Sequence, residues 1–334
     1  MQKSWIPLVC SPTLRVLIID AAHPRLSIRD LLSALKNLPL LENLCLRGVP
    51  DPADFESLPY PPLHQLKSLH VDGGYHGCLK LMHHLRIPDD TLVNVGVTAG
   101  DDSFWDTGDV SDIIQDRAQV RARQPTLCSV STSPDDKTVT IKMCSLAEDG
   151  VDVSSPWLTV TVAYHPRSIY TWRDPVWELL EDVIKESDWS SNIQILEFLV
   201  NYWDYGGRYR VPLSGLNRLS SLRELRVRAL SHEMGKLICG VDGDDVPFPC
   251  LKKILITGEG CDAKVHKRTY NVLGRTLHRR SERQTPIQEL HVAKRTARRI
   301  TDADISQWKR CAGLRDVLIM DDFPNLVPEF HCVH

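Results

Sequence analysis

Apolar residues recur along the chain in one short pattern, apolar-x-x-apolar-x-apolar, with mostly polar residues between them. The pattern first appears as Leu14-x-x-Leu17-x-Ile19 and returns as Leu41-x-x-Leu44-x-Leu46. It occurs seven more times, at residues 66–71, 92–97, 193–198, 222–227, 251–256, 287–292 and 314–319. Within each half of the chain, successive starts lie 25 to 36 residues apart. This spacing is typical of arrays in which one strand and one helix form each turn.

The stretches between these patterns favour helices. Ser27 and Asp30 form a helix start, and apolar residues then follow at helical spacing over residues 28–35. Asp174-Pro175 and Thr301-x-x-Asp304 predict two further starts. Short helices are also expected near residues 77–86, 108–122, 231–239 and 264–281. Each helix has one apolar stripe, which it can bury only against the strand layer. The predicted fold is therefore an α/β leucine-rich-repeat solenoid, with a parallel strand layer and helices on the convex side.

The middle of the chain is less regular. Residues 127–132 and 157–162 are plausible strands, and residues 137–146 add an extra strand that reads as a hairpin partner after the turn at 133–136. The region could break the array or divide it in two, and we favour one continuous array. The predicted organisation is a lead-in at 1–13, an array at 14–325 with an irregular middle (98–192), and a tail at 326–334.

Strand periodicity also predicts a contact surface. Alternate residues of each strand face away from the core, and in a solenoid they line the concave surface. Apolar residues at such positions, for example Ile18, Ile195 and Leu318, are covered either by a partner or by the chain itself. The mixed character of this face suits a protein partner better than a small molecule. The candidate partner-binding residues are Asn43, Arg47, Ser68, His70, Asp72, Glu224, Arg226, Arg228, Glu289 and His291.

Composition fits an ordinary soluble protein. Of the 334 residues, 42% are hydrophobic and 25% are charged, which argues against wholesale disorder. No apolar run reaches the length of a membrane helix, and no N-x-[ST] sequence occurs. The ten cysteines include no C-x-x-C pair, which favours reduced thiols. We therefore expect a cytoplasmic or nuclear protein without a membrane segment.

Charge is unevenly distributed. The formal net charge is −3, but residues 264–299 contain eleven Lys and Arg against the two acids Glu282 and Glu289. A solvated helix face is the plain interpretation, and an anionic partner is the sharper one. Tyr270 is the single aromatic residue in this segment, so stacking on nucleic-acid bases would be weak. Nucleic-acid binding through 264–299 is therefore an alternative function rather than the main one.

Three short motifs could carry chemistry. Gly258-x-Gly260-x-x-Ala263 follows a strand and precedes a helix, as a dinucleotide-binding turn does, but it lies inside a repeat. His83-His84 and His331-Cys332-x-His334 lack further metal ligands at a fixed spacing. The acids Asp242, Asp244 and Asp245 lack the glutamate that closes an EF-hand loop. We expect no catalysis, no cofactor and no metal, with a nucleotide-binding enzyme as the weakest alternative.

The repeats resemble those of the fungal F-box proteins with leucine-rich repeats. The resembling segments are 31–49, 61–73 and 78–97, with 196–200, 219–227 and 250–258 similar to later turns. The resemblance implies a non-catalytic module that recognises a protein substrate for a ubiquitin ligase. The F-box, which usually opens with an L-P-x-E-[IL] helix, is not visible, because the first repeat strand already begins at Leu14. The Skp adaptor and cullin are therefore expected partners only if an F-box exists outside this chain.

Overall fold

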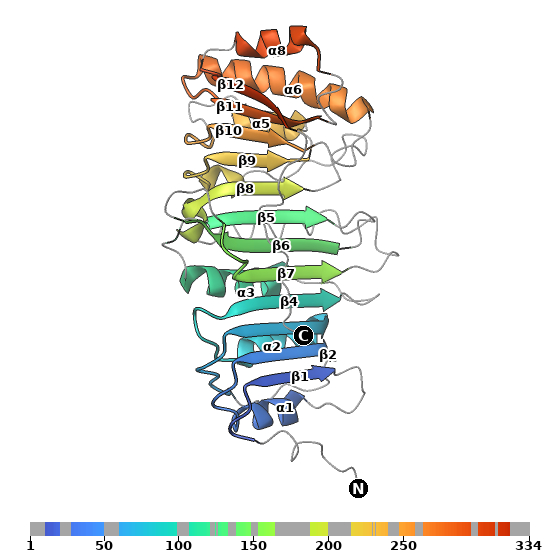
Figure 1. The fold of residues 1–334 in the computed structure, drawn as a ribbon, viewed down its shortest axis with the longest axis vertical. Helices are drawn as coiled ribbons and strands as arrows, with labels where there is room; N and C mark the ends of the chain where they lie inside the picture. Colours follow the sequence, from blue (N-terminus) through green and yellow to red (C-terminus); the bar gives the residue numbers. More distant parts are fainter. Residues whose placement is uncertain are drawn as a thin grey trace.

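The computed structural model is an open α/β structure with one twelve-stranded, mostly parallel sheet (Figure 1). It describes residues 11–20, 28–49, 60–98, 107–120, 124, 126–132, 138–147, 153–163, 188–199, 215–228, 230, 232–239, 247–257, 263–294, 300–310 and 313–320. The strands are β1 (Val16–Asp20), β2 (Asn43–Val49), β3 (Ser68–Gly74), β4 (Leu92–Thr98), β5 (Thr126–Thr132), β6 (Thr138–Ser145), β7 (Leu158–Ala163), β8 (Ile193–Leu199), β9 (Glu224–Val227), β10 (Lys253–Ile256), β11 (Glu289–Ala293) and β12 (Asp316–Met320).

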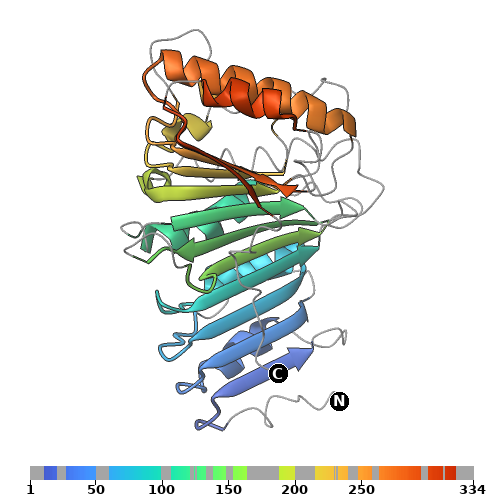
Figure 2. The same cartoon turned by 45° about the horizontal axis from the view of Figure 1, so that its top comes forward.

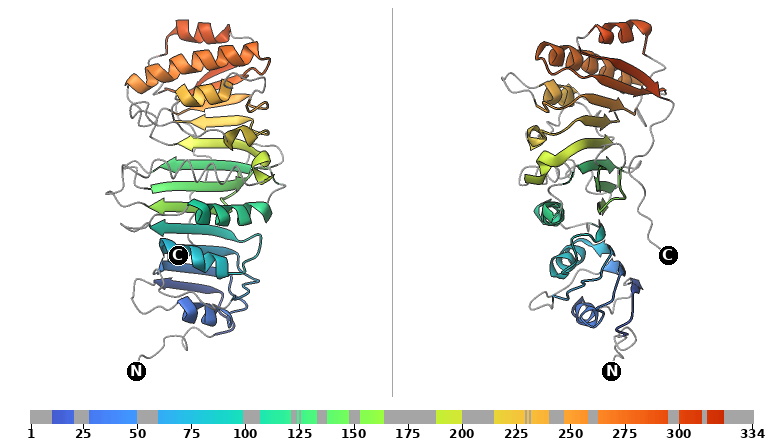
Figure 3. Two further views of the ribbon diagram at one scale, coloured as in Figure 1. Left: turned by 180° about the vertical axis from the view of Figure 1, so that it is seen from behind. Right: turned by 60° about the vertical axis from the view of Figure 1, so that its left-hand side comes forward.

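Helices cover one face of this sheet. They are α1 (Ile28–Leu35), α2 (Tyr75–His84), α3 (Thr107–Val120), α5 (His232–Cys239), α6 (Ala263–Glu282) and α8 (Asp302–Lys309), with short 3-10 turns η3 (Asp188–Asn192) and η5 (Gly215–Arg218). Viewed from its side, the strand layer has the helices on one side (Figure 3). The helices predicted from the pattern in these regions are confirmed. The helix expected after Asp174 lies outside the described residues.

The capping box at Thr301 is confirmed. The Asp304 N–H donates to the Thr301 hydroxyl, and the Thr301 N–H donates back to the Asp304 carboxylate at 2.9 Å. The two contacts satisfy amide groups that have no partner within the first turn of a helix. The start of α8 is therefore fixed by local chemistry that the sequence alone displays.

Each sequence pattern is a strand, as predicted. The buried positions follow one another across the sheet, so that Leu17 is opposite Leu44 and Leu44 is opposite Leu69. The pattern at 92–97 is offset by two residues from the strand pairing, because Leu69 is opposite Val93 rather than Val95. Val93, Val95 and Val97 are all buried, so a run of alternating valines fits the pattern in two registers. In the structure, Val93 is the valine that lies opposite Leu69.

The irregular middle is a three-stranded meander within the same sheet. The strand order is β4-β7-β6-β5-β8, and β6 is antiparallel to both neighbours. The predicted hairpin between residues 127–132 and 137–146 is confirmed. β7 is parallel to β4 and β5 is parallel to β8, so the meander runs back toward the first half of the chain. The sheet therefore continues across this region, as Figure 2 shows.

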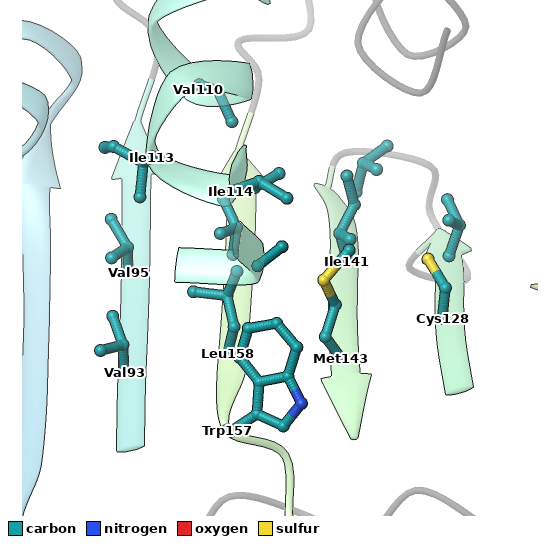
Figure 4. Close-up of a cluster of buried hydrophobic side chains, with 14 of the residues drawn as sticks. Val93, Val95, Val110, Ile113, Ile114, Cys128, Ile141, Met143, Trp157 and Leu158 are labelled. Atoms are coloured by element: carbon teal, nitrogen blue, oxygen red, sulfur yellow. The ribbon is translucent and has the colours of Figure 1, made fainter. Parts of the chain in front are cut away.

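The core lies between the sheet and the helices. One cluster of buried apolar residues extends from Leu17 to Leu314. Around the middle strands, Val110, Ile113 and Ile114 of α3 pack above the side chains of neighbouring strands (Figure 4). Burying a leucine or isoleucine side chain contributes about 1.5–3 kcal/mol, so this layer holds the array together. The opposite face of the sheet is left for other contacts.

Candidate functional site

The sheet face opposite the helices, called the open face below, presents one side chain from every strand in a single row. Cross-strand pairing connects these positions without interruption. Alternate residues of a strand point to opposite faces, and the intervening positions belong to the core. The row, called the central row, is Ile18, Cys45, His70, Asn94, Thr159, Lys142, Ser129, Glu197, Arg226, Leu255, His291 and Leu318.

The structure places nine of the ten candidate residues within strands, on positions that alternate with core residues. They come from β2, β3, β9 and β11, and Arg228 directly follows β9. They form two groups, because β2 and β3 are separated from β9 and β11 by several strands. Their role in binding stays a prediction. The geometry nevertheless shows that they are held to different degrees.

In the C-terminal group, the buried Arg226 side chain lies between the carboxylates of Glu224 and Glu197. Its guanidinium is paired with the Glu224 carboxylate and lies 3.8 Å from Glu197 Oε1. The Ser129 hydroxyl donates to the other Glu197 oxygen at 2.6 Å, across 68 residues of sequence. The Arg226 side chain is only 10% exposed. Arg226 is therefore a fixed charge within the sheet rather than a free surface side chain.

Lys253 extends this set of charges toward β11. Its Nζ lies 3.2 Å from Glu224 Oε2 and 3.9 Å from Glu289 Oε2. His291 Nε2 lies 3.5 Å from the same Glu289 oxygen. We call the whole set the charge ladder: Ser129, Glu197, Arg226, Glu224, Lys253, Glu289 and His291. Glu289 is its most exposed acid, with 45% of its side chain accessible.

His291 is held toward its neutral form. Burial lowers the pKa of His291, and the positive charge of Lys253 lowers it further, whereas Glu289 and Glu224 oppose the shift. Depression of the pKa disfavours protonation near neutral pH. The ladder accordingly presents alternating acids and bases from Glu197 to Glu289 and ends on an uncharged imidazole.

In the N-terminal group, Asp72 connects two strands. One of its oxygens accepts from the Gly48 N–H at 2.9 Å, and the other lies 3.0 Å from His70 Nε2. The amide contact occurs where the β2–β3 register shifts between Leu46 and Val49. Asp72 therefore stabilises a bulge and orients His70 on the open face.

Apolar positions on the open face divide into two kinds. Ile195 packs with Leu127, Cys144 and Leu146 in a second, smaller core cluster on this face, so the chain covers it. In contrast, Ile18 is 52% exposed and Leu318 is 48% exposed. The chain itself therefore covers Ile195, whereas covering of Ile18 and Leu318 by a partner stays a prediction. The accessible apolar positions lie at the two ends of the sheet.

Sequence reasoning missed the polar residues of the middle strands and of β10. Asn94, Thr159 and Lys142 belong to the central row. Thr140 and Thr161 form the next pair on the same face of β6 and β7, and their hydroxyl oxygens lie 3.2 Å apart. The same alternation that selected the other candidates would have found them. Asn94 lies in a regular repeat, where alternation alone identifies it, whereas the pattern does not reveal the pairing order of the strands that contain Thr159 and Lys142.

The basic segment does not form a uniform charged face. Arg280 is fully buried, whereas Arg275 and Arg279 on the same helix are exposed. The Arg280 guanidinium donates to five backbone carbonyls, those of Ile238, Pro247, Phe248, Leu251 and Thr285. Of the eleven basic residues in the segment, Arg280 therefore has a structural role inside the core.

The remaining chemical motifs gain no support. Gly258, Gly260 and the acids 242–245 lie outside the described residues, as does the C-terminal His331 motif. Within the described part of the chain, no three His, Cys, Asp or Glu side chains are grouped so that they could hold a metal ion. No helix of that part is long and apolar enough to cross a membrane. Burial raises the pKa of the Cys128 and Cys144 thiols to about 12, which makes them poor nucleophiles.

A comparison with models of protein families found no match, and a search of curated proteins found none either.

Proposed function

We propose that the chain is a non-catalytic leucine-rich-repeat module that binds a protein partner through its open face. The observation that carries the proposal is the central row, which aligns one side chain from each of twelve strands on the face without helices. Repeat arrays of this kind offer extended surfaces on which a rigid backbone fixes the spacing of side chains. A folded protein is a partner large enough to span several strands.

The distribution of residues supports an interface of this type. Half-exposed apolar side chains at Ile18 and Leu318 can be buried by a partner, and they are candidates for the few anchors that dominate affinity. The charge ladder is held by its own contacts before any partner binds. Such preorganisation reduces the entropy lost on association, and fixed charges reject partners with the wrong charge pattern.

The proposal extends to the role that the family resemblance implies. In a ubiquitin ligase of that type, the repeats would bind the substrate, and the Skp adaptor would bind an F-box elsewhere. The ten candidate residues, from Asn43 in β2 to His291 in β11, would then take part in substrate selection. No residue of this chain is assigned to the adaptor.

β12 supplies a matched pair of variants for the test. Leu318 and Ile319 are adjacent and both 48% exposed, but Leu318 lies in the central row and Ile319 on the alternate side. At the other end, Ile18 on the open face can be compared with the exposed Leu40 in a turn before β2. Ile18→Arg with Leu318→Arg is the test variant, and Leu40→Arg with Ile319→Arg is the control.

The experiment uses quantitative affinity purification from the source cells, followed by titration of the purified partner. We expect the control to retain the partner and the test variant to bind at least about tenfold more weakly, which is a loss of about 1.4 kcal/mol. Equal binding by the two variants would remove the open face from the interaction. Recovery of the Skp adaptor and a cullin would support the ligase role, and their absence beside another enriched protein would limit the proposal to a free-standing binding module.

A further inference from the structure

A groove at the C-terminal end of the array lies between α6 and α8, away from the charge ladder. It encloses about 680 Å³, and its lining residues are Tyr270, Asn271, Gly274, Arg275, His278, Asp304, Gln307, Trp308 and Arg310. Both helices are at the end of the sheet beyond β10 (Figure 2). The groove is therefore a separate surface from the open face.

The floor of the groove is a close contact between the two helices. The rings of Tyr270 and Trp308 lie 6.0 Å apart, and Trp308 is buried. Gly274 lies beside this contact, because a Cβ at its position would be 3.4 Å from Trp308 Nε1, in ordinary van der Waals contact.

The charges of the groove are unbalanced. Arg275 and Arg310 are exposed on opposite walls, and neither forms an ion pair with any described residue. Asp304 is the single acid among the described lining residues, and its Oδ2 already accepts from the Thr301 N–H and hydroxyl at 2.9 and 2.7 Å. His278 lies 3.2 Å from Glu282 on the same helix. Among the described lining residues, the two arginines therefore outnumber the single acid.

We propose that this groove binds an acidic peptide segment of a partner protein, with Arg275 and Arg310 clamping carboxylate or phosphate oxygens. Arginine presents a planar fork of donors that matches both oxyanions. The shared chemistry is an oxyanion on a polypeptide, supplied either by Asp and Glu or by a phosphorylated side chain. The site would add a second contact beyond the open face.

An extended nucleic acid fits this surface less well. The buried Trp308 offers no free face for base stacking, and Arg280 is withdrawn into the core one turn beyond the groove. Glu282, paired with His278, would repel a phosphate backbone that continued along α6. A short acidic segment avoids each of these obstacles.

The test uses the whole chain and three fluorescent peptides of one length: Glu-rich, phosphoserine-containing, and a Gln/Ser counterpart. Binding is measured by fluorescence anisotropy at low and at physiological salt, with a single-stranded RNA as competitor. The test variant is Arg275→Glu with Arg310→Glu. The control is Arg279→Glu with Arg315→Glu, which makes the same charge change at exposed positions outside the groove lining.

We expect the acidic peptides to bind and the neutral one not to bind. The test variant should weaken binding at least about tenfold, because two charge-assisted contacts are lost, and the control should change it less than about threefold. Preference for the phosphoserine or the Glu peptide identifies the oxyanion. The proposal is overturned if no acidic peptide binds, if both variants weaken binding alike, or if RNA binds more tightly and loses its affinity in the test variant. Because Ile18 and Leu318 are unchanged here, the outcome is independent of the open-face test.

Discussion

Replacing the buried Arg280 tests how the C-terminal turns are held together. The Arg280 side chain projects from α6, and its guanidinium donates to five backbone carbonyls at 2.9–3.4 Å. These carbonyls belong to the end of α5, to the segment before β10 and to the segment after α6. Burial lowers the pKa of Arg280 to about 10, so the group stays charged at neutral pH. One cation therefore serves backbone groups from three separate parts of the chain.

The expected loss in the free energy of unfolding follows from the contacts that Arg280→Met would remove. Methionine keeps much of the aliphatic stem but leaves the carbonyls without their donor, and each buried unsatisfied group costs about 1–3 kcal/mol. Two effects reduce the sum: some carbonyls reach water, and the cost of burying the guanidinium disappears. We expect a net loss of about 3–5 kcal/mol, with Arg280→Lys intermediate because an ammonium has three donors and no fork.

Hydrogen exchange measured by mass spectrometry is the suitable assay, because a repeat array can open locally without global unfolding. In Arg280→Met, the amides of α5, of β10 and of the end of α6 should exchange roughly a hundredfold faster or more, as the estimated loss requires. The amides of β2–β4 should be unaffected. Arg279→Met, an exposed neighbour on the same helix, is the control. Indistinguishable exchange in the two variants would refute the assignment of Arg280 as a clip.

Two other predictions concern single sites. Gly73 has φ +151°, and a Cβ there would lie 2.3 Å from backbone atoms of Val49. Gly73→Ala should therefore lower the free energy of unfolding, measured by urea titration, by about 1–3 kcal/mol. An unfolding midpoint equal to that of the parent protein would contradict this. With pKa values of about 12, Cys128 and Cys144 hold about one thiolate in ten thousand at pH 8. Iodoacetamide should therefore label the exposed Cys250 long before either of them, and equal labelling rates would contradict the buried placement.

The strands could be predicted because each one needs a fixed set of apolar residues on the core side. A leucine such as Leu225, fully buried in the structure, leaves little freedom in where its strand lies. The helices were predictable for the same reason, and the Thr301 box from local hydrogen bonding alone. β4 shows the limit of the method, since alternating valines satisfy the core in more than one register.

The long-range order of the sheet was not predictable in this way. β5 pairs with β8 across some 60 intervening residues, and β6 and β7 fill the space toward β4. The turn at 133–136 indicates the β5–β6 hairpin, but nothing local in residues 126–163 indicates that β7 pairs with β4 or that β5 pairs with β8. For the same reason, the contact of Ser129 with Glu197 could not be found. The buried position of Arg280 could not be predicted for another reason, because a run of basic residues ordinarily indicates a solvated helix face.

The charge ladder separates the two faces of the sheet by what they contribute. On the helix side, nearly every inward residue is apolar, which is the cheapest way to stabilise a layer. On the open face, Glu197 and Arg226 are almost as inaccessible, yet they are charged. A buried ion pair of this kind often stabilises no better than apolar residues of similar volume, because desolvation offsets the attraction. Stability alone therefore gives no reason for charges at these positions, whereas a preorganised pattern on a binding face does. This contrast supports the proposal that the open face, rather than the helix side, selects a protein partner.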